Sequence, residues 1–127
     1  ATQYTNRVIP DVAAHSSMFP AWPVIYRLKN AKGEWKRQYK LVAGTSAATP
    51  LIATMIASAN ASRADGKQLG FVNPALYAKG AANQASAFVD ITSGNNAVAG
   101  EAAGYAATTG FDLVTGWGVP KFTAFTQ

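Results

Sequence analysis

The sequence predicts one compact unit, or a piece of one, in which β-strands and α-helices are mixed. Hydrophobic residues make up 49% of the 127 residues and charged residues only 13%, a composition that supplies a core and argues against disorder. Two β-favouring runs with turn residues between them lie in the first third of the chain. A long alanine-rich segment of helical character follows the second run directly.

Composition also excludes several kinds of site. The chain has no cysteine, so disulfides, thiolate zinc sites and a cysteine nucleophile are excluded. Its single histidine, His15, cannot form a multi-histidine metal site within one copy, and we expect it in a loop or at a strand end rather than as a catalytic base. The longest apolar stretch, residues 51–59, is too short to span a membrane. No signal peptide opens the chain, so we expect any targeting segment to have been removed or to lie elsewhere.

Residues 7–13 have the pattern of a short strand that Pro10 interrupts. Proline lacks the backbone donor of a strand ladder, so an edge or a bend is favoured there. Asp11 lies among apolar neighbours and needs a partner, for which Arg7 is the nearest candidate. A structural ion pair is therefore preferred to a catalytic role for Asp11.

Residues 24–29 and 35–42 are the two β-favouring runs, and residues 30–33 between them predict the turn of a β-hairpin. Six of the eleven positive charges lie here, in a chain of net charge +5, and they predict a basic outer face. Nucleic-acid bases could stack on Tyr26, Trp35 and Tyr39, with phosphates on the cations. A solvated face with the aromatic rings turned inward is preferred, because no nucleic-acid-binding motif accompanies the run. The six cations are Arg27, Lys29, Lys32, Lys36, Arg37 and Lys40.

The junction between the second run and the helix is the most informative stretch. Gly44 allows a sharp turn after Val42, and Pro50, which fits within a first helical turn, sets the start of the helix near Thr45 or Ser46. A serine there exposes its hydroxyl, and its N–H is one of the unpaired amides of the helix N-terminus. Ser46 could thus be both nucleophile and oxyanion donor. The alternative is that Ser46 or Thr45 only caps the helix.

The second half of the chain predicts smaller elements. Residues 73–77 predict a short helix with Asn73 as its cap, residues 78–87 a surface loop of small residues, and residues 119–125 a final helical turn whose phenylalanines pack on the sheet. Between Asp90 and Asp112 lies a loop rich in glycine and asparagine, whose carbonyls could surround a hard cation. The alternative is that these two aspartates only make Asx turns.

Several of these segments together resemble one peptidase family. Residues 44–50, Gly-Thr-Ser-Ala-Ala-Thr-Pro, resemble the nucleophile motif of subtilisin-like serine peptidases. Residues 7–13, 70–77, 88–96 and 105–118 look like consecutive landmarks of the sedolisins, the serine-carboxyl peptidases, in the family's order. The resemblance implies the C-terminal part of a subtilisin-like α/β domain, doubly wound with a mainly parallel sheet. It also implies hydrolysis of peptide bonds at low pH, in a secreted or other acidic extracytoplasmic compartment.

The resemblance carries over only one catalytic residue, Ser46, as the nucleophile that forms an acyl-enzyme. Family members activate this serine with a glutamate, and an aspartate four residues after the glutamate orients that glutamate. Another aspartate lies in the oxyanion hole, within a Gly-Asp-Ser-like loop. The glutamates here, Glu34 and Glu101, are followed four residues later by Gln38 and Tyr105, and no Gly-Asp-Ser occurs. We therefore expect an N-terminal chain of the same peptidase to supply these carboxylates.

Residues 1–127 are accordingly expected to be a C-terminal segment, a second chain, of an acid-active endopeptidase that acts on polypeptide substrates. Low pH suits this chemistry. A glutamate base with a pKa of about 4.3 is already ionised in mild acid, whereas an oxyanion-hole aspartic acid can donate a hydrogen bond only while it is protonated. One alternative is a module that binds peptides without cleaving them. Another is a nucleic-acid or anionic-surface binder that uses the hairpin. The preferred interpretation includes neither nucleic acid nor membrane as a partner.

The resemblance also implies a calcium ion as cofactor. Family members bind it through two aspartates and three backbone carbonyls, and the matching residues are Asp90, Ile91, Thr108, Gly110 and Asp112. Thr108 stands where many members have glycine. A carbonyl ligand tolerates this if the backbone angle does.

Overall fold

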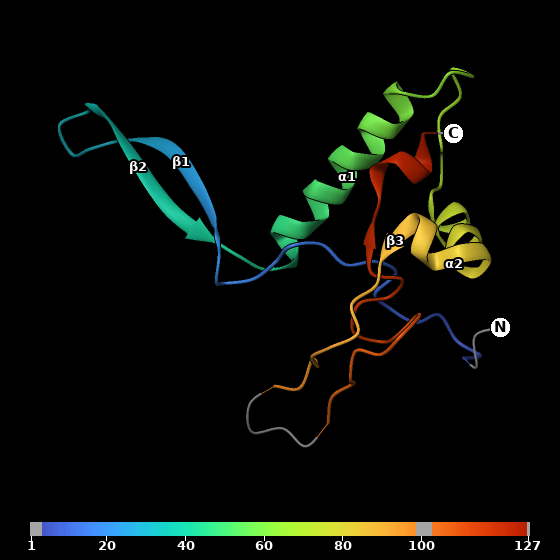
Figure 1. Cartoon of the computed structure of the whole chain (residues 1–127). Helices are drawn as coiled ribbons and strands as arrows, with labels where there is room; N and C mark the ends of the chain where they lie inside the picture. The colour runs from blue at the N-terminus through green and yellow to red at the C-terminus, as the bar shows by residue number, and fades with distance from the viewer. Residues whose placement is uncertain (1–3, 99–102, 127) are drawn as a thin grey trace. The chain divides into compact units, whose positions relative to one another are not determined.

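A computed structural model describes residues 4–98 and 103–126 of the chain. The chain divides into two compact units, residues 14–52 and residues 1–13 with 53–127. Figure 1 shows the helices and strands in chain order. They are β1 (Trp22–Lys29), β2 (Trp35–Val42), α1 (Thr45–Ala61), α2 (Asn73–Ala87), β3 (Phe88–Val89), β4 (Val119–Pro120) and the short 3-10 helix η1 (Phe122–Phe125).

The unit of residues 14–52 is built on an antiparallel hairpin, where the sequence predicted one (Figure 1). Strands β1 and β2 pair from Trp22 opposite Val42 to Lys29 opposite Trp35. The Asn30 side chain closes the turn by accepting hydrogen bonds from the N–H groups of Lys32 and Glu34, at 2.9 and 3.0 Å. Local turn chemistry thus fixes the register of the hairpin.

The prediction of a single basic outer face on this hairpin is wrong. Residues opposite each other in the register share a face, and alternate positions along a strand point to opposite faces. Arg27, Lys29 and Arg37 therefore lie on one face, while Lys36 and Lys40 lie on the other.

Two of the three aromatic residues expected to turn inward do not do so, while Tyr26 is half-buried. Trp35 and Tyr39 are 60% and 79% exposed. Nearly every residue of both strands is exposed, so this two-stranded sheet has no buried face. A two-stranded hairpin is at best marginally stable without another layer to pack on.

Helix α1 begins at Thr45, as the sequence predicted. Pro50, however, lies beyond its first turn, which corrects the expected position of that proline. Proline has no N–H, so the Ser46 carbonyl does not receive the usual bond from the residue four positions later. In the same turn the Thr49 hydroxyl donates to the Thr45 carbonyl at 2.8 Å. The helix carries no charged residue, and only Ala59 in it is buried.

The core of the other unit forms where α1, α2, β3 and η1 contribute apolar side chains. Its buried residues are Ala59, Leu76, Ala87, Phe88 and Phe125. The Phe88 ring lies edge-on to Phe125, with 6.0 Å between ring centroids, and stacks with Trp117 at 6.3 Å. The predicted final helical turn is present as η1, and its Phe125 is buried while Phe122 is 37% exposed.

Helix α2 corrects the prediction of a short helix followed by a loop over residues 78–87. It continues to Ala87, with a kink at Asn83, where the backbone is non-helical. Alanine favours a helix, and burial against Trp117 adds a tertiary reason. A β-carbon on Gly80 would come within 2.4 Å of the Trp117 ring, so a glycine is required where α2 meets that ring.

The mainly parallel sheet that the family resemblance implied does not occur within the described residues. Both strand pairs there are antiparallel, β1 with β2 and β3 with β4. A parallel pair needs a second strand beside the first after a crossover helix. Strand β2 leads into α1 as such a unit would begin, but β3, the next strand, has two residues and pairs with β4 instead.

Residues 7–13 form no strand, contrary to the sequence prediction. Their backbone makes two separate contacts, in which Trp117 N–H donates to the Asp11 carbonyl at 2.9 Å and Ala13 N–H donates to the Gly118 carbonyl at 3.0 Å. Without a continuous ladder, and with Pro10 lacking a donor, no strand propagates. Gly116 lets this segment approach, since a β-carbon there would overlap the Asp11 carbonyl.

None of the helices in the described part of the chain has the length and apolar content that crossing a bilayer requires.

Candidate active site and cation loop

Ser46 lies on the first turn of α1, immediately after a strand and a glycine turn. Gly44 adopts φ 104°, in the left-handed region, and its N–H donates to the Ser16 carbonyl at 2.8 Å. The Gly44 carbonyl in turn accepts the N–H of Ala47 at 2.9 Å. The bond from Gly44 to Ser16 holds the start of the helix against the loop of residues 14–20. The strand, turn and helix therefore follow one another as the sequence predicted.

The Ser46 side chain is exposed, and its hydroxyl makes no hydrogen bond to any described residue. Neither Ser46 nor Thr45 caps α1 through its side chain in the described structure. The N–H of Ser46 belongs to the first helical turn, whose amides have no partner inside the helix. Hydroxyl and amide are thus both available to a bound molecule.

No base within the unit of residues 14–52 is available to Ser46. His15 uses its Nε2 on the Pro20 carbonyl, at 2.8 Å, and its ring packs edge-on to Trp22 with 5.3 Å between centroids. The histidine therefore lies in a loop, as predicted. The one carboxylate in this unit, Glu34, is held at the hairpin turn by Asn30 at 3.0 Å and Lys36 at 3.1 Å. Those two contacts lower the pKa of Glu34.

Asp90 begins the predicted cation loop. Its Oδ2 accepts the N–H of Gly110 at 2.8 Å, which joins two residues twenty positions apart. Its Oδ1 is buried and has no hydrogen-bond partner among the described residues. A buried oxygen left without a donor costs about 1–3 kcal/mol, and more when it is charged. This orphaned oxygen fits a bound cation.

Asp112 is 5% exposed and is surrounded by donors. Its Oδ2 accepts the N–H of Thr108 at 2.9 Å, and its Oδ1 accepts the N–H groups of Val114 and Thr115, both at 2.8 Å. Burial raises the pKa of Asp112, but the hydrogen bonds from Thr108, Thr115 and Val114 outweigh it and hold the pKa below its ordinary value. The carboxylate is therefore ionised in mild acid.

These contacts bring four of the five predicted ligand residues together in pairs, Asp90 with Gly110 and Asp112 with Thr108. Ile91 follows Asp90 in the chain. The Asx-turn alternative holds for Asp112, which bonds the N–H two residues on, whereas Asp90 makes its bond across the loop. The described residues contain no cluster of three or more His, Cys, Asp or Glu, so further ligands here would be carbonyls or water.

A second polar cluster, centred on Asp11, confirms the predicted ion pair with Arg7, whose Nη2 lies 2.6 Å from Asp11 Oδ2. Asp11 also accepts hydrogen bonds from Asn73 Nδ2 at 2.9 Å and from the Tyr77 hydroxyl at 2.7 Å. Burial raises the pKa of Asp11, but Arg7, Tyr77 and Asn73 together lower it below its ordinary value. Sequence analysis missed Asn73 and Tyr77 as partners, although their spacing of four places them on one helix face.

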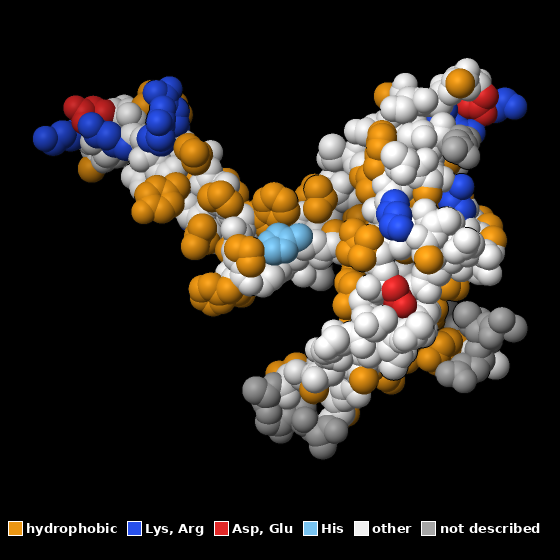
Figure 2. Space-filling model, in the orientation of Figure 1, with side chains coloured by type: hydrophobic (Ala, Val, Ile, Leu, Met, Phe, Trp, Pro, Cys, Tyr) orange, Lys and Arg blue, Asp and Glu red, His pale blue; other side chains and the backbone are white. Residues whose placement is uncertain are grey.

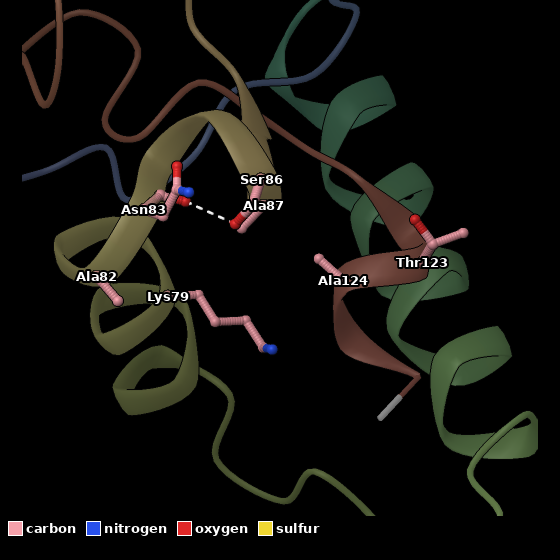
Figure 3. Close-up of a pocket in the computed structure, with 7 residues that line it drawn as sticks. All are labelled: Lys79, Ala82, Asn83, Ser86, Ala87, Thr123 and Ala124. Atoms are coloured by element: carbon pink, nitrogen blue, oxygen red, sulfur yellow. Dashed lines mark hydrogen bonds between the residues drawn. The ribbon is translucent and has the colours of Figure 1, made fainter.

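A hollow of about 460 Å³ lies between α2 and η1 (Figure 3). Lys79, its one charged side chain, lies with its Nζ 5.6 Å from the centroid of the Phe125 ring. No acidic side chain is among the residues that line this hollow. Its walls are Lys79, Ala82, Asn83, Ser86, Ala87, Thr123 and Ala124.

Comparison with known proteins adds to this geometry. No family model matches the chain. It is 45% identical over 121 residues to tripeptidyl-peptidase sed1 of Aspergillus fumigatus, a match of 94% of this chain and 16% of that protein. It is 35% identical over 116 residues to kumamolisin of a Bacillus species, covering 91% of this chain and 18% of kumamolisin. It is 37% identical over 142 residues to tripeptidyl-peptidase sed4 of A. fumigatus, a match of 95% of this chain and 22% of that protein.

These relatives are peptidases of the subtilisin-like α/β class. The chain spans about a fifth of their length. Within that class, the chain belongs to the sedolisin family, and it corresponds to a C-terminal portion of these relatives.

Proposed function

We propose that this chain is the part of an acid-active serine-carboxyl peptidase that carries the nucleophile, Ser46. The observation that supports it is a serine with an unpartnered hydroxyl and an unpaired N–H at a strand–glycine–helix junction, in a chain of the sedolisin family. In this proposal Ser46 Oγ attacks a peptide carbonyl and forms an acyl-enzyme. The Ser46 N–H donates to the oxyanion, and water then releases the acyl group.

The base must come from outside the unit that holds Ser46. Glu34 is engaged at the hairpin turn, and His15 is engaged with Pro20. An N-terminal chain of the same peptidase therefore supplies the Glu/Asp pair and the oxyanion aspartic acid. Such chemistry suits a secreted protein or another acidic extracytoplasmic compartment, because the base must be ionised while the oxyanion acid stays protonated.

Calcium is the proposed cofactor of the loop between Asp90 and Asp112. The orphaned Oδ1 of Asp90 supports it, and the carboxylates of Asp90 and Asp112 would hold the ion with the carbonyls of Ile91, Thr108 and Gly110. The ion would supply structural support, since it neutralises two carboxylates in one loop. It takes no part in acyl transfer.

The position of the cleaved bond has two candidates. The sequence analysis favours an endopeptidase, which cuts within a chain. The A. fumigatus relatives are named tripeptidyl-peptidases, and these names favour release of tripeptides from an N-terminus. Mass spectrometry of the products from one long peptide distinguishes the two, because only the second yields successive losses of three residues.

The nucleophile is tested by Ser46→Ala in this chain assembled with the N-terminal part of the peptidase. We expect cleavage of a denatured protein at about pH 4 to fall by about 10⁴-fold or more while assembly is unchanged. Ser58→Ala, an exposed serine on the same helix, is the matched control and keeps full activity. Near-normal cleavage by the Ser46 variant would refute the assignment. Native mass spectrometry checks assembly, since the proposal requires an associated larger chain.

A further inference from the structure

Two arginines face each other across the hairpin. Arg27 of β1 is directly opposite Arg37 of β2, and both side chains are exposed on the same face. Directly opposite residues have β-carbons only about 5 Å apart, and like charges in such a pair destabilise the sheet. Neither arginine has an ion-pair partner in the described parts of the chain. We call Arg27 and Arg37 the arginine pair.

Apolar side chains flank the arginine pair on both sides. The next pair toward the base of the hairpin is Ile25 with Tyr39, which are 70% and 79% exposed. Toward the turn, Lys29 is opposite Trp35, and its Nζ lies 5.3 Å from the Trp35 ring centroid. Figure 2 shows blue cationic side chains gathered at the turn end of the hairpin and orange hydrophobic ones along its length.

This surface fits an acidic side chain with apolar neighbours. A carboxylate between two guanidinium groups would relieve their repulsion, and arginine binds a carboxylate with paired hydrogen bonds. The one acid of this unit, Glu34, is already held by Asn30 and Lys36, so it does not fill that position. A second copy of the chain is a poor occupant, because each copy carries a net charge of +5.

The hairpin and Ser46 belong to the same unit, so the arginine pair has a defined connection to the nucleophile. Val42, which ends β2 shortly before Ser46, is five positions after Arg37 along the strand. At about 3.4 Å per residue this is about 17 Å, to which the turn adds a few more. An extended polypeptide spans that distance in about five to eight residues.

We propose that the arginine pair is a substrate exosite, which binds an acidic residue about five to eight positions from the scissile bond of the polypeptide being cleaved. The inference rests on the proposed peptidase function and adds a specificity determinant to it. Arginine stays charged at every working pH, whereas a substrate glutamate ionises only above about pH 4.3. The preference for acidic substrates therefore strengthens as the pH rises from about 3.5 to about 6.

The experiment uses the chain assembled with the N-terminal part of the peptidase and a set of matched peptides. Each peptide carries either glutamate or glutamine five to eight residues from one cleavable bond, on either side of it. For the best-placed position we expect a KM about 3- to 10-fold lower for the glutamate peptide at about pH 6, with kcat unchanged. At about pH 3.5 most of this difference disappears, since most of the glutamate is protonated.

The double variant Arg27→Gln/Arg37→Gln should abolish the glutamate preference at pH 6 while cleavage of the glutamine peptide is unchanged. It removes a like-charge repulsion, so it should fold at least as well as the wild type. Lys32→Gln, a cation in the hairpin turn outside the strands, is the matched control and keeps the preference.

Fluorescence anisotropy of the labelled peptides keeps the test independent of catalysis. If neither peptide is cleaved, the proposed function fails, and tighter binding of the glutamate peptide that the double variant loses still supports the exosite. Equal KM and equal binding for both peptides in the wild type would overturn the exosite, as would a preference that survives the double variant. Tighter binding of a thymidine oligonucleotide that the double variant loses would assign the pair to nucleic acid and also overturn it.

Discussion

Replacement of Asp90 by asparagine tests the cation loop most directly, because it changes the one buried side-chain oxygen that lacks a hydrogen-bond donor among the residues that the structure describes. In the structure Asp90 Oδ2 accepts the N–H of Gly110 at 2.8 Å, while Oδ1 is buried without a partner. Asparagine has nearly the same shape and keeps one oxygen for Gly110. It removes the negative charge that a calcium ion would neutralise.

The substitution should have opposite effects on stability in the calcium-free and the calcium-bound loop. Without calcium, wild type bears a buried, charged oxygen with no donor, a cost of about 1–3 kcal/mol or more. Asparagine replaces it with a neutral amide, so the variant should melt at or above the wild-type temperature in chelator. At a calcium concentration one hundred times the dissociation constant, binding to the folded form alone stabilises the wild type by about 2.7 kcal/mol. For an assembled protein of 150–250 residues or more, this raises the melting temperature by at most about 5–11 °C.

The assay is a thermal melt of the assembled protein at about pH 5.5, with chelator and with increasing calcium. We expect the wild-type and Asp90→Asn curves to change order as calcium is added. Asp65→Asn is the matched control, because Asp65 is exposed and paired with Arg63, and its response to calcium should equal that of the wild type. A wild-type melting temperature indifferent to calcium would refute the cation site, and a variant that still responds would refute the role of Asp90.

Three further predictions concern stability. Tyr77→Phe removes a 2.7 Å hydrogen bond to Asp11 and should lower the free energy of unfolding by about 1 kcal/mol at about pH 6. Because the folded state lowers the pKa of Asp11, this contribution is present above the ordinary aspartate range and is lost as the pH falls through the lowered pKa, which denaturant unfolding at several pH values would show. Gly80→Ala places a methyl group against the Trp117 ring and should lower the free energy of unfolding by about 1–3 kcal/mol, despite the better helix propensity of alanine. The control Ala82→Gly, on the exposed side of α2, should lower it by only about 0.5–1 kcal/mol, and a stabilised Gly80 variant would contradict the packing. The isolated 127-residue chain should show no cooperative thermal transition, because α1 buries one residue and both hairpin strands are exposed, and sharp amide dispersion in its NMR spectrum would disprove this.

The sequence by itself determined the features that depend on neighbours along the chain. Gly44 and the alanine-rich run after it placed the turn and the start of α1, and the turn residues around Asn30 placed the hairpin. The pair of Arg7 with Asp11 followed from proximity in sequence. The motif around Ser46 led to the subtilisin-like serine peptidases, and the segments 7–13, 70–77, 88–96 and 105–118 narrowed the resemblance to the sedolisins, since a motif needs no tertiary information to be recognised.

Tertiary structure decided what depends on contacts between distant segments. Helix α2 extends through residues that read as a loop, in part because Gly80 packs on Trp117, thirty-seven positions away. The hairpin register, not the count of charges, divided the cations between two faces and set Arg27 opposite Arg37. Asp90 Oδ1 is buried without a partner in a carboxylate whose other oxygen accepts the N–H of Gly110, twenty positions away. Burial, register and desolvation arise only when separate segments meet, so composition and local patterns do not specify them.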